Sequence, residues 1–209
     1  VIYISGSTGV PKGVLISYKG MMNTIIDINE RMGINENASI LGLSSYCFDL
    51  SVYDLFGSLI AGAELDIAKD IRETDEIRHF MDHSKNILWN SVPAGMELFI
   101  DSLEESYVNH ELKSVLLSGD WISVSLPARI AKHFPEAKIY SLGGATEASI
   151  WSIIFPIEHV EDSWQSIPYG YPLANQTIYV LNESLEICPP EVQGEIYIGG
   201  AGVAQGYVN

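Results

Sequence analysis

ILWNSVPAGMELFIDSLEESYVNHELKSVLLS, residues 87–118, contains two short apolar runs with a helical pattern between them. The first run, 87–90, and the second, 114–118, have the composition of buried strands. Pro93 opens the intervening pattern, because proline is favoured in the first turn of a helix. A strand, a crossover helix and a second strand in succession predict two parallel neighbours in one sheet.

The same alternation extends to both sides of this unit. We expect a helix between the capping residues Ser17 and Gly33, and another that begins with Pro127. The further expected strands are 1–4, 39–43, 64–67 and 138–141, and the further expected helices are 51–63, which is apolar almost all round and therefore buried, and 75–83.

After about residue 150 the helical patterns stop. Strands are expected at 150–155, 177–182 and 195–198, separated by turns rich in Gly, Pro and Asn. The predicted fold class is therefore α/β, with a layered sheet-and-helix part over about 1–149 and the start of a β-barrel-like lobe over about 150–209. Both ends look interrupted, so we expect part of a larger domain, truncated at both ends and inactive in isolation.

Composition narrows the function classes. Of 209 residues, 47% are hydrophobic and 18% charged, which predicts a folded core. A net charge of −16 disfavours nucleic acid and anionic membrane surfaces as partners. No apolar run approaches the roughly 18 residues of a spanning helix. The two cysteines, Cys47 and Cys188, lack C-x-x-C spacing, which favours reduced thiols in a soluble cytoplasmic protein.

Residues 5–13, SGSTGVPKG, have the composition of a phosphate-binding loop. Small residues let backbone N–H groups approach a phosphate, and hydroxyls and Lys12 add donors and positive charge. Pro11 and Gly13 exclude a Walker A loop, and Ser5 stands where a G-x-S-x-G elbow has its first glycine. A surface loop with one solvated lysine is the alternative interpretation.

Residues 3–14, YISGSTGVPKGV, resemble as a whole the phosphate-binding signature of the adenylate-forming enzymes. Three further matches follow in that family's order: FDLS at 48–51, GGATE at 143–147, and GEIYIGG at 194–200 with GVAQGY at 202–207. On these four motifs the chain is identified as a member of that superfamily, also called the AMP-dependent synthetases and ligases. It resembles in particular the adenylation domains of nonribosomal peptide synthetases.

The resemblance implies a two-step reaction. An amino acid is activated with ATP and Mg²⁺ as an aminoacyl-adenylate, and a phosphopantetheine thiol on a carrier domain of the same synthetase then captures it. Lys12, Thr146 and Glu147 are the implied catalytic residues, with Lys12 on the β- and γ-phosphates, Thr146 on the α-phosphate and Glu147 on Mg²⁺. The implied nucleotide-binding residues are Ser5, Gly6, Ser7, Thr8, Gly9, Lys12, Gly144 and Thr146. Without the motif, Glu147 would be one exposed acid among 27 acidic residues.

The resemblance also assigns the amino-acid pocket. In the amino-acid-activating branch, the aspartate at the position of Asp49 pairs with the substrate's α-ammonium group. Capping of the helix that follows is the alternative interpretation. The implied pocket residues are Asp49, Leu50, Tyr53, Asn90, Leu116, Ser118, Leu142, Ile150 and Trp151. The series resembles that of cysteine-activating domains, although shape alone does not separate Cys from Ser, Ala or Val, where one group contributes about 1–3 kcal/mol.

The sequence departs from the family pattern at two places, of which the first concerns the nucleotide. Gly143 stands where relatives have an aromatic residue that stacks on adenine, and Ala145 replaces a proline. The space that Gly143 leaves could be filled by Trp151 or by a neighbouring loop. Tyr18 stands where many relatives have a histidine.

Other patterns are weaker. His79 and His83 are four residues apart, but without a third ligand a solvated helix face is favoured over zinc. Cys47 is expected to be buried and to pack against neighbouring side chains, without a role as a nucleophile. Two other functions stay open: an acyl-CoA or aryl-acid ligase, which would have no use for Asp49, and a non-catalytic nucleotide-binding remnant.

Overall fold

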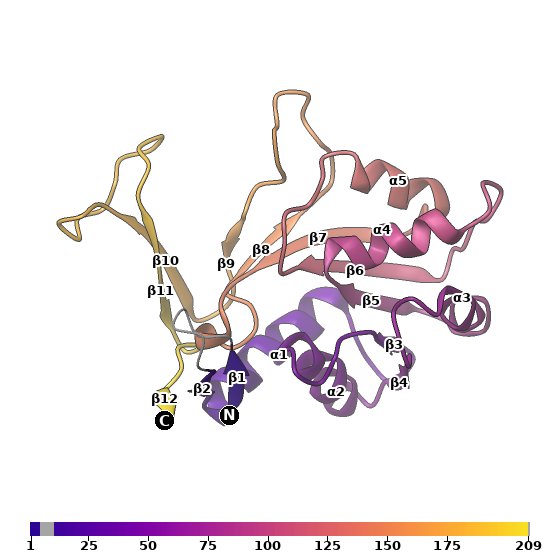
Figure 1. Ribbon diagram of the computed structural model, residues 1–209, viewed down its shortest axis with the longest axis horizontal. Coiled ribbons are helices and arrows are strands. Elements are labelled where there is room, and N and C mark those ends of the chain that lie inside the picture. The colour runs from indigo at the N-terminus through magenta and orange to yellow at the C-terminus, as the bar shows by residue number, and fades with distance from the viewer. Residues whose placement is uncertain (5–10, 209) are drawn as a thin grey trace.

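The computed structural model describes residues 1–4 and 11–208. A seven-stranded sheet runs through its centre in the order β4-β3-β5-β6-β7-β8-β9 (Figure 1). The strands of this sheet are β3 (Ser39–Gly42), β4 (Glu64–Ile67), β5 (Ile87–Ser91), β6 (Leu112–Ser118), β7 (Lys138–Gly143), β8 (Ile153–Pro156) and β9 (Tyr171–Pro172). The first five strands in this order are parallel to one another. β8 pairs antiparallel with β7, and β9 pairs antiparallel with β8. The predicted α/β class is confirmed.

Helices cover both faces of this sheet (Figure 1). α1 (Tyr18–Met32) and α2 (Leu50–Ala61) lie on one face. α3 (Thr74–His83), α4 (Pro93–Ser102) and α5 (Leu126–His133) lie on the other. The sheet is therefore the middle layer between two separate apolar cores.

Successive strand residues point to opposite cores. Trp89 and Leu117 pack against α3–α5, whereas Leu88 and Leu116 pack against α1 and α2. Side chains alternate along a strand, and parallel strands are buried on both faces, so every second position of β5 and β6 faces α1 and α2. Asn90 pairs in register with Leu116, which places both on that face.

Helix ends follow the predicted capping residues. The Ser17 hydroxyl accepts a hydrogen bond from the N–H of Gly20 at 2.9 Å, and Gly33 ends α1 with a φ of 67°. The expectation that α2 is buried all round is wrong for its outer face. There Phe56 and Ile60 are more than a third exposed, and Leu59 is 72% exposed.

The β-rich part of the chain is divided among three sheets. β8 and β9 extend the central sheet, whereas β10 (Gln176–Leu181) and β11 (Glu195–Gly200) form an antiparallel hairpin that projects from the body (Figure 1). We therefore propose that the β-rich lobe begins after β9, and not at about residue 150.

The two ends of the described chain meet in a third sheet. β2 (Lys12–Leu15) pairs with β1 (Ile2–Ile4) on one side and with β12 (Gly206–Val208) on the other, so both termini lie together in Figure 1. The pairing joins the segment after the predicted phosphate loop to the last glycine-rich motif.

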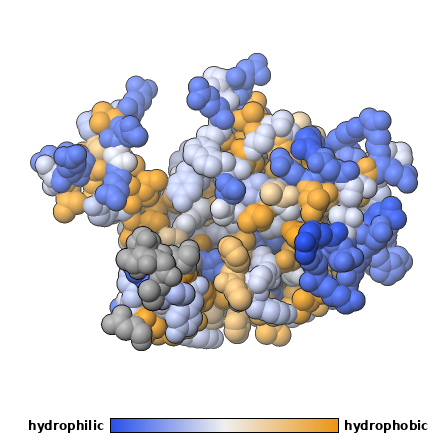
Figure 2. Space-filling model, viewed as in Figure 1, coloured by the Kyte–Doolittle hydropathy of each residue, from blue (hydrophilic) through white to orange (hydrophobic). Residues whose placement is uncertain are grey.

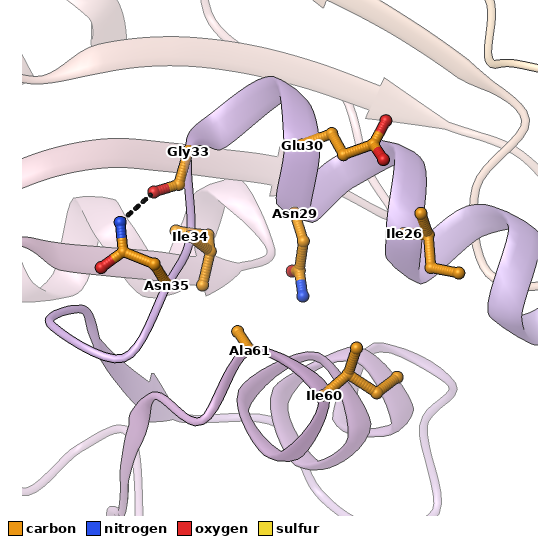
Figure 3. Close-up of a pocket in the computed structure, with 8 residues that line it drawn as sticks. All are labelled: Ile26, Asn29, Glu30, Gly33, Ile34, Asn35, Ile60 and Ala61. Atoms are coloured by element: carbon orange, nitrogen blue, oxygen red, sulfur yellow. Dashed lines mark hydrogen bonds between the residues drawn. The ribbon is translucent and has the colours of Figure 1, made fainter.

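A shallow hollow of about 380 Å³ lies between the ends of α1 and α2 (Figure 3). It includes none of the predicted site residues. Asn29, on its wall, joins the two helices: its Nδ2 donates to Gly57 O and its Oδ1 accepts from the Tyr53 hydroxyl, each at 2.9 Å. Because all these groups are buried, each needs its partner.

Replacement of Asn29 by alanine should therefore lower the free energy of unfolding by about 1–3 kcal/mol, since it leaves the buried Tyr53 hydroxyl unpaired and removes the bond to the Gly57 carbonyl. Urea unfolding of the protein measures this change. Asn35→Ala is the matched control, because the hydrogen bonds of Asn35 are exposed. Equal effects of the two substitutions would contradict the assignment.

Candidate active site

Lys12 and Glu147 meet at one side chain, Tyr207. The Lys12 ammonium lies 5.7 Å from the centroid of the Tyr207 ring, and the Tyr207 hydroxyl donates to Glu147 Oε1 at 2.6 Å. The hydrogen bond to the carboxylate raises the pKa of Tyr207. Residues 12 and 147, far apart in the sequence, thus lie on one side of the molecule.

Thr146 joins Asp49 to this group. The Thr146 hydroxyl donates to Asp49 Oδ2 at 2.6 Å. Asp49 immediately precedes α2, but its carboxylate makes no side-chain capping hydrogen bond to that helix. The carboxylate thus faces the segment of Thr146 and Glu147, and it also interacts with the backbone N–H of Leu50 at the start of α2.

Residues 202–207, the last glycine-rich motif, hold the segment around Glu147 in place through hydrogen bonds. Ala204 N–H donates to the Glu147 carbonyl at 2.7 Å, and the Ser149 hydroxyl donates to the Gly202 carbonyl at 2.6 Å. A Cβ on Gly202 would come within 2.7 Å of the Ala148 carbonyl oxygen, so only glycine allows the contact. The motif therefore positions the short helix η1 (Thr146–Ala148) relative to β2.

Part of the predicted nucleotide site lies outside the described residues, namely Ser5, Gly6, Ser7, Thr8 and Gly9. Their roles stay predictions. Gly144 has a φ of 157°, and a Cβ there would lie 2.8 Å from Ser152 N. Glycine at this position is therefore required by both backbone conformation and space.

The electrostatics of the group favour a cation beside Asp49. Burial raises the pKa of Asp49 and the nearby Glu147 charge acts in the same direction, whereas the Thr146 hydrogen bond lowers it. Two carboxylates and a hydroxyl are hard oxygen donors of the kind that bind Mg²⁺ or an ammonium group. Mg²⁺ usually takes one or two carboxylates together with substrate phosphates, so this donor set fits the ion.

The predicted pocket residues gather in the core between the sheet and α1 and α2. Asn90 is fully buried and Ser118 is 3% exposed. Asp49 lies partly exposed at the start of α2. The remaining six belong to one apolar cluster: Leu50, Tyr53, Leu116, Leu142, Ile150 and Trp151.

Trp151 enters this cluster through a strained turn. Ser149 and Ile150 have φ values of 64° and 72°, which are rare for residues other than glycine. Thr24 Oγ1 donates to the Ser149 carbonyl at 2.9 Å, and Gln176 Nε2 donates to the Trp151 carbonyl at 3.0 Å. The turn places the centroid of the Trp151 ring 5.1 Å from that of the Tyr53 ring. Because the turn interrupts the extended chain, β8 starts at residue 153 and not at the predicted 150.

Asp54 is a buried acid beside the predicted pocket residue Asn90, and the sequence reasoning missed it. It is 2% exposed, and burial raises its pKa to about 7, while a hydrogen bond from Asn90 Nδ2 to Asp54 Oδ1 at 2.7 Å acts in the opposite direction. Asp54 Oδ2, Asn90 Oδ1 and Ser118 Oγ have no protein partner among the described residues. An acid within an otherwise apolar helix was the signal that could have found it.

The space beside Gly143 holds the ring of Tyr169. A Cβ on Gly143 would lie 2.1 Å from Tyr169 Cε2. The sequence analysis expected either Trp151 or a neighbouring loop to fill the space beside Gly143. The loop that carries Tyr169 fills it, so the expectation of Trp151 is wrong.

Four other residues considered in the sequence analysis lie outside this group: Tyr18, Cys47, His79 and His83. Cys47 is exposed, so its predicted burial is wrong, and Tyr18 is 73% exposed. His83 Nδ1 lies 2.7 Å from the His79 carbonyl oxygen. Among residues 1–4 and 11–208, no cluster of three or more His, Cys, Asp or Glu side chains has the arrangement of a metal site.

The chain matches the family model described as AMP-binding enzyme over residues 1–208. It therefore belongs to the AMP-binding enzyme family, as the four motifs predicted. Bacitracin synthase 1 of Bacillus licheniformis is 54% identical over 209 residues, which are all of this chain and 4% of that protein. Pyochelin synthetase PchF of Pseudomonas aeruginosa is 47% identical over 211 residues, covering 99% of this chain and 12% of the relative. The chain thus spans only a small part of these relatives.

Solved structures agree on the fold. The nonribosomal peptide synthetase FmoA3 is 36% identical with a TM-score of 0.91, matching all of this chain and 23% of its own. The N-terminal subdomain of NpsA from Klebsiella oxytoca is 29% identical with a TM-score of 0.82, matching all of this chain and 53% of its own. The chain is thus similar to nonribosomal peptide synthetases in sequence and in structure.

The described helices include none with both the length and the apolar character that a bilayer crossing requires.

Asp54 predicts a pH dependence of stability. Its pKa is about 7 in the fold against an ordinary 3.8, so between these values the unfolded chain gives up a proton that the folded chain keeps. Stability is therefore lost as the pH rises from about 4 to 7, by up to about 4 kcal/mol. The Asp54→Asn variant lacks this loss, and its stability relative to the wild type should rise by about 2–3 kcal/mol between pH 5 and pH 8.

Urea unfolding at the two pH values measures the difference. Asp75→Asn is the control, because the side chain of Asp75 is 99% exposed. A wild-type protein whose stability relative to Asp54→Asn is the same at both pH values would show that Asp54 titrates normally.

Proposed function

We propose that the protein containing this chain is an adenylate-forming ligase that activates an amino acid, cysteine in preference, for nonribosomal peptide synthesis. The observation that carries this proposal is the convergence of Lys12, Glu147, Thr146 and Asp49 through Tyr207 and the Thr146 hydroxyl. A cation for phosphate, oxygen donors for Mg²⁺ and a partly buried carboxylate for an ammonium group lie next to one another.

Positioning and charge neutralisation supply most of the chemistry. Lys12 binds the triphosphate, Thr146 holds the α-phosphate beside the substrate carboxylate, and Glu147 provides the oxygen ligand for Mg²⁺. Held at Glu147, Mg²⁺ would supply positive charge that offsets the negative charge of the phosphates. The carboxylate oxygen then bonds to the α-phosphorus, and the bond from that phosphorus to the leaving pyrophosphate breaks. FmoA3 has been solved with AMPPNP bound, which supports nucleotide binding by this fold.

Asp49 selects for amino acids. Its burial makes the free carboxylate costly, and a substrate ammonium group offsets that cost by pairing with it. A plain carboxylic acid brings no such charge. FmoA3 has also been solved with α-methyl-L-serine-AMP, which supports an amino-acid substrate for the relatives.

The unpaired pocket atoms favour a small side chain with a weak donor. Asn90 Nδ2 is used by Asp54, which leaves Asn90 Oδ1 as a free acceptor, and Ser118 Oγ is also free. The cysteine S–H group can donate to such an acceptor, whereas the methyl groups of alanine and valine cannot. The Tyr53 hydroxyl is taken by Asn29, so Tyr53 contributes only its ring.

The second step transfers the aminoacyl group to a phosphopantetheine thiol. This thiol is carried by a carrier domain of the same synthetase, which we propose as the chain's partner. NpsA has been solved as an artificial fusion of an adenylation domain and a PCP domain. Because the reaction consumes ATP and both described cysteines are free, we place the protein in the cytoplasm.

An aryl-acid ligase is the second candidate. The NpsA subdomain that resembles this chain was solved with 3-hydroxybenzoyl-AMSN, an analogue without an amino-acid ammonium group. The carboxylate of Asp49 distinguishes the two functions, since an aryl acid gives it no partner.

Amino-acid-dependent ATP–pyrophosphate exchange by the full-length protein tests the proposal. Across the twenty amino acids and a set of aryl acids, cysteine should give the highest kcat/KM. Asp49→Asn should lower kcat/KM for cysteine about 100-fold, because a partly buried charge pair loses one partner. The control Asp75→Asn changes an exposed acid on α3 and should have no effect.

Other outcomes of the exchange assay would contradict different parts of the proposal. No exchange with any acid would show that the proposed function is wrong. Exchange that Asp49→Asn leaves intact would favour the aryl-acid or acyl-CoA ligase. Alanine or valine activated as well as cysteine would overturn only the assignment of the side-chain pocket.

A further inference from the structure

A second cavity, of about 650 Å³, has Gly143 and Gly144 in its lining, shortly before Thr146 in the chain. It is lined by the residues after β6 (119–122), the end of β7 with the glycines that follow (141–144), the segment before β9 (166–169) and Ile196 of the hairpin. Figure 2 shows hydrophobic colour on the projecting lobe near the body and hydrophilic colour at its tips. The cavity therefore lies where the hairpin meets the central sheet.

The charges of this cavity indicate which part of a ligand it accepts. Among its described lining residues, Asp120 is the charged side chain, and no lysine or arginine is present. A triphosphate would find no cation here, whereas Lys12 offers one beside Glu147. The cavity is therefore suited to an uncharged group attached to the phosphates.

Tyr169 lines this cavity, and its ring packs directly against the backbone of Gly143. A Cβ on Gly143 would lie 2.1, 2.5 and 2.9 Å from Tyr169 Cε2, Cζ and Cδ2, so one edge of the ring rests on the Gly143 backbone. The φ of Gly143 is not in the left-handed region. Glycine is therefore required at 143 by the space that the ring occupies and not by backbone conformation.

The chain on both sides of Tyr169 holds the ring in place. Ile167 is 8% exposed, and Tyr171 pairs with Ile154 of β8. Gly170, with a φ of 114°, lets the chain approach β8 so closely that a Cβ would lie 2.3 Å from the Ile154 carbonyl oxygen. Tyr169 itself stays 45% exposed, so much of its ring is available to a ligand in the cavity.

We propose that Tyr169 supplies the aromatic surface on which the purine base of the nucleotide stacks, and that Gly143 is glycine in order to admit this ring. The inference rests on the proposed function and deepens it, because it assigns a base-binding residue outside the four motifs. The base would lie beside Gly143, three residues before Thr146, with the phosphates directed toward Lys12.

The substitution Tyr169→Leu removes the ring but keeps apolar volume, and it tests the proposal in the full-length protein. Base stacking on an aromatic side chain corresponds to about 5- to 100-fold in affinity. The KM for ATP in pyrophosphate exchange should rise by that factor. Tyr169→Phe, which keeps the ring, should bind ATP as the wild type does. Tyr171→Leu is the matched control, since this exposed tyrosine lies two residues away and does not line the cavity.

Inorganic tripolyphosphate separates base binding from structural damage, because it has phosphates and no base. Its inhibition constant should be the same for the wild type and Tyr169→Leu. Gly143→Val, which displaces the ring without altering it, should likewise weaken ATP and leave tripolyphosphate unchanged.

Three results would overturn the proposal: an unchanged KM for ATP in Tyr169→Leu, an equal loss of ATP and tripolyphosphate binding, or a loss in Tyr169→Phe as large as in Tyr169→Leu. These results are distinct from failure of the proposed function. In that case the wild type itself would show neither amino-acid-dependent exchange nor inhibition by tripolyphosphate.

Discussion

The pairing of β2 with β12 is the constraint on which the site depends. It places Lys12 and Tyr207 on neighbouring strands, and the Tyr207 hydroxyl then reaches Glu147. The backbone bond from Ala204 to the Glu147 carbonyl strengthens the same junction. Most of the last glycine-rich motif therefore acts as a structural support. It fixes the segment of Thr146 and Glu147 relative to β2, the strand at the end of the predicted phosphate loop.

The site combines carboxylates that destabilise the empty protein with ligands that would neutralise them. Burial raises the pKa of Asp49, and burial beside the predicted pocket residue Asn90 raises that of Asp54 to about 7. The positive φ angles of Ser149 and Ile150 add backbone strain. These costs are concentrated at the positions where an ammonium group, a metal ion and a side-chain donor would bind. Perturbed pKa values and backbone strain cluster at functional sites.

Local features of the fold could be predicted from sequence because they depend on near neighbours. Ser17 and Gly33 limit α1 as their capping preferences require, and alternation along β5 and β6 fixes which residues face α1 and α2. Cys47, Asp54 and Tyr169 could not be placed in this way. The exposure of Cys47, the burial of Asp54 against Asn90 and the contact of Tyr169 with Gly143 all depend on how segments far apart in the chain pack. The convergence of the motifs themselves followed only from the family resemblance.

A crystal structure of the full-length protein with cysteine and a manganese complex of a non-hydrolysable ATP analogue tests the central claim most directly. Anomalous scattering locates the manganese ion independently of the protein atoms. We expect the ion within direct coordination distance of the Glu147 carboxylate, about 2–2.5 Å, with the terminal phosphates at Lys12 and the substrate ammonium group at Asp49. An ion remote from Glu147, or a triphosphate that makes no contact with Lys12, would contradict the account.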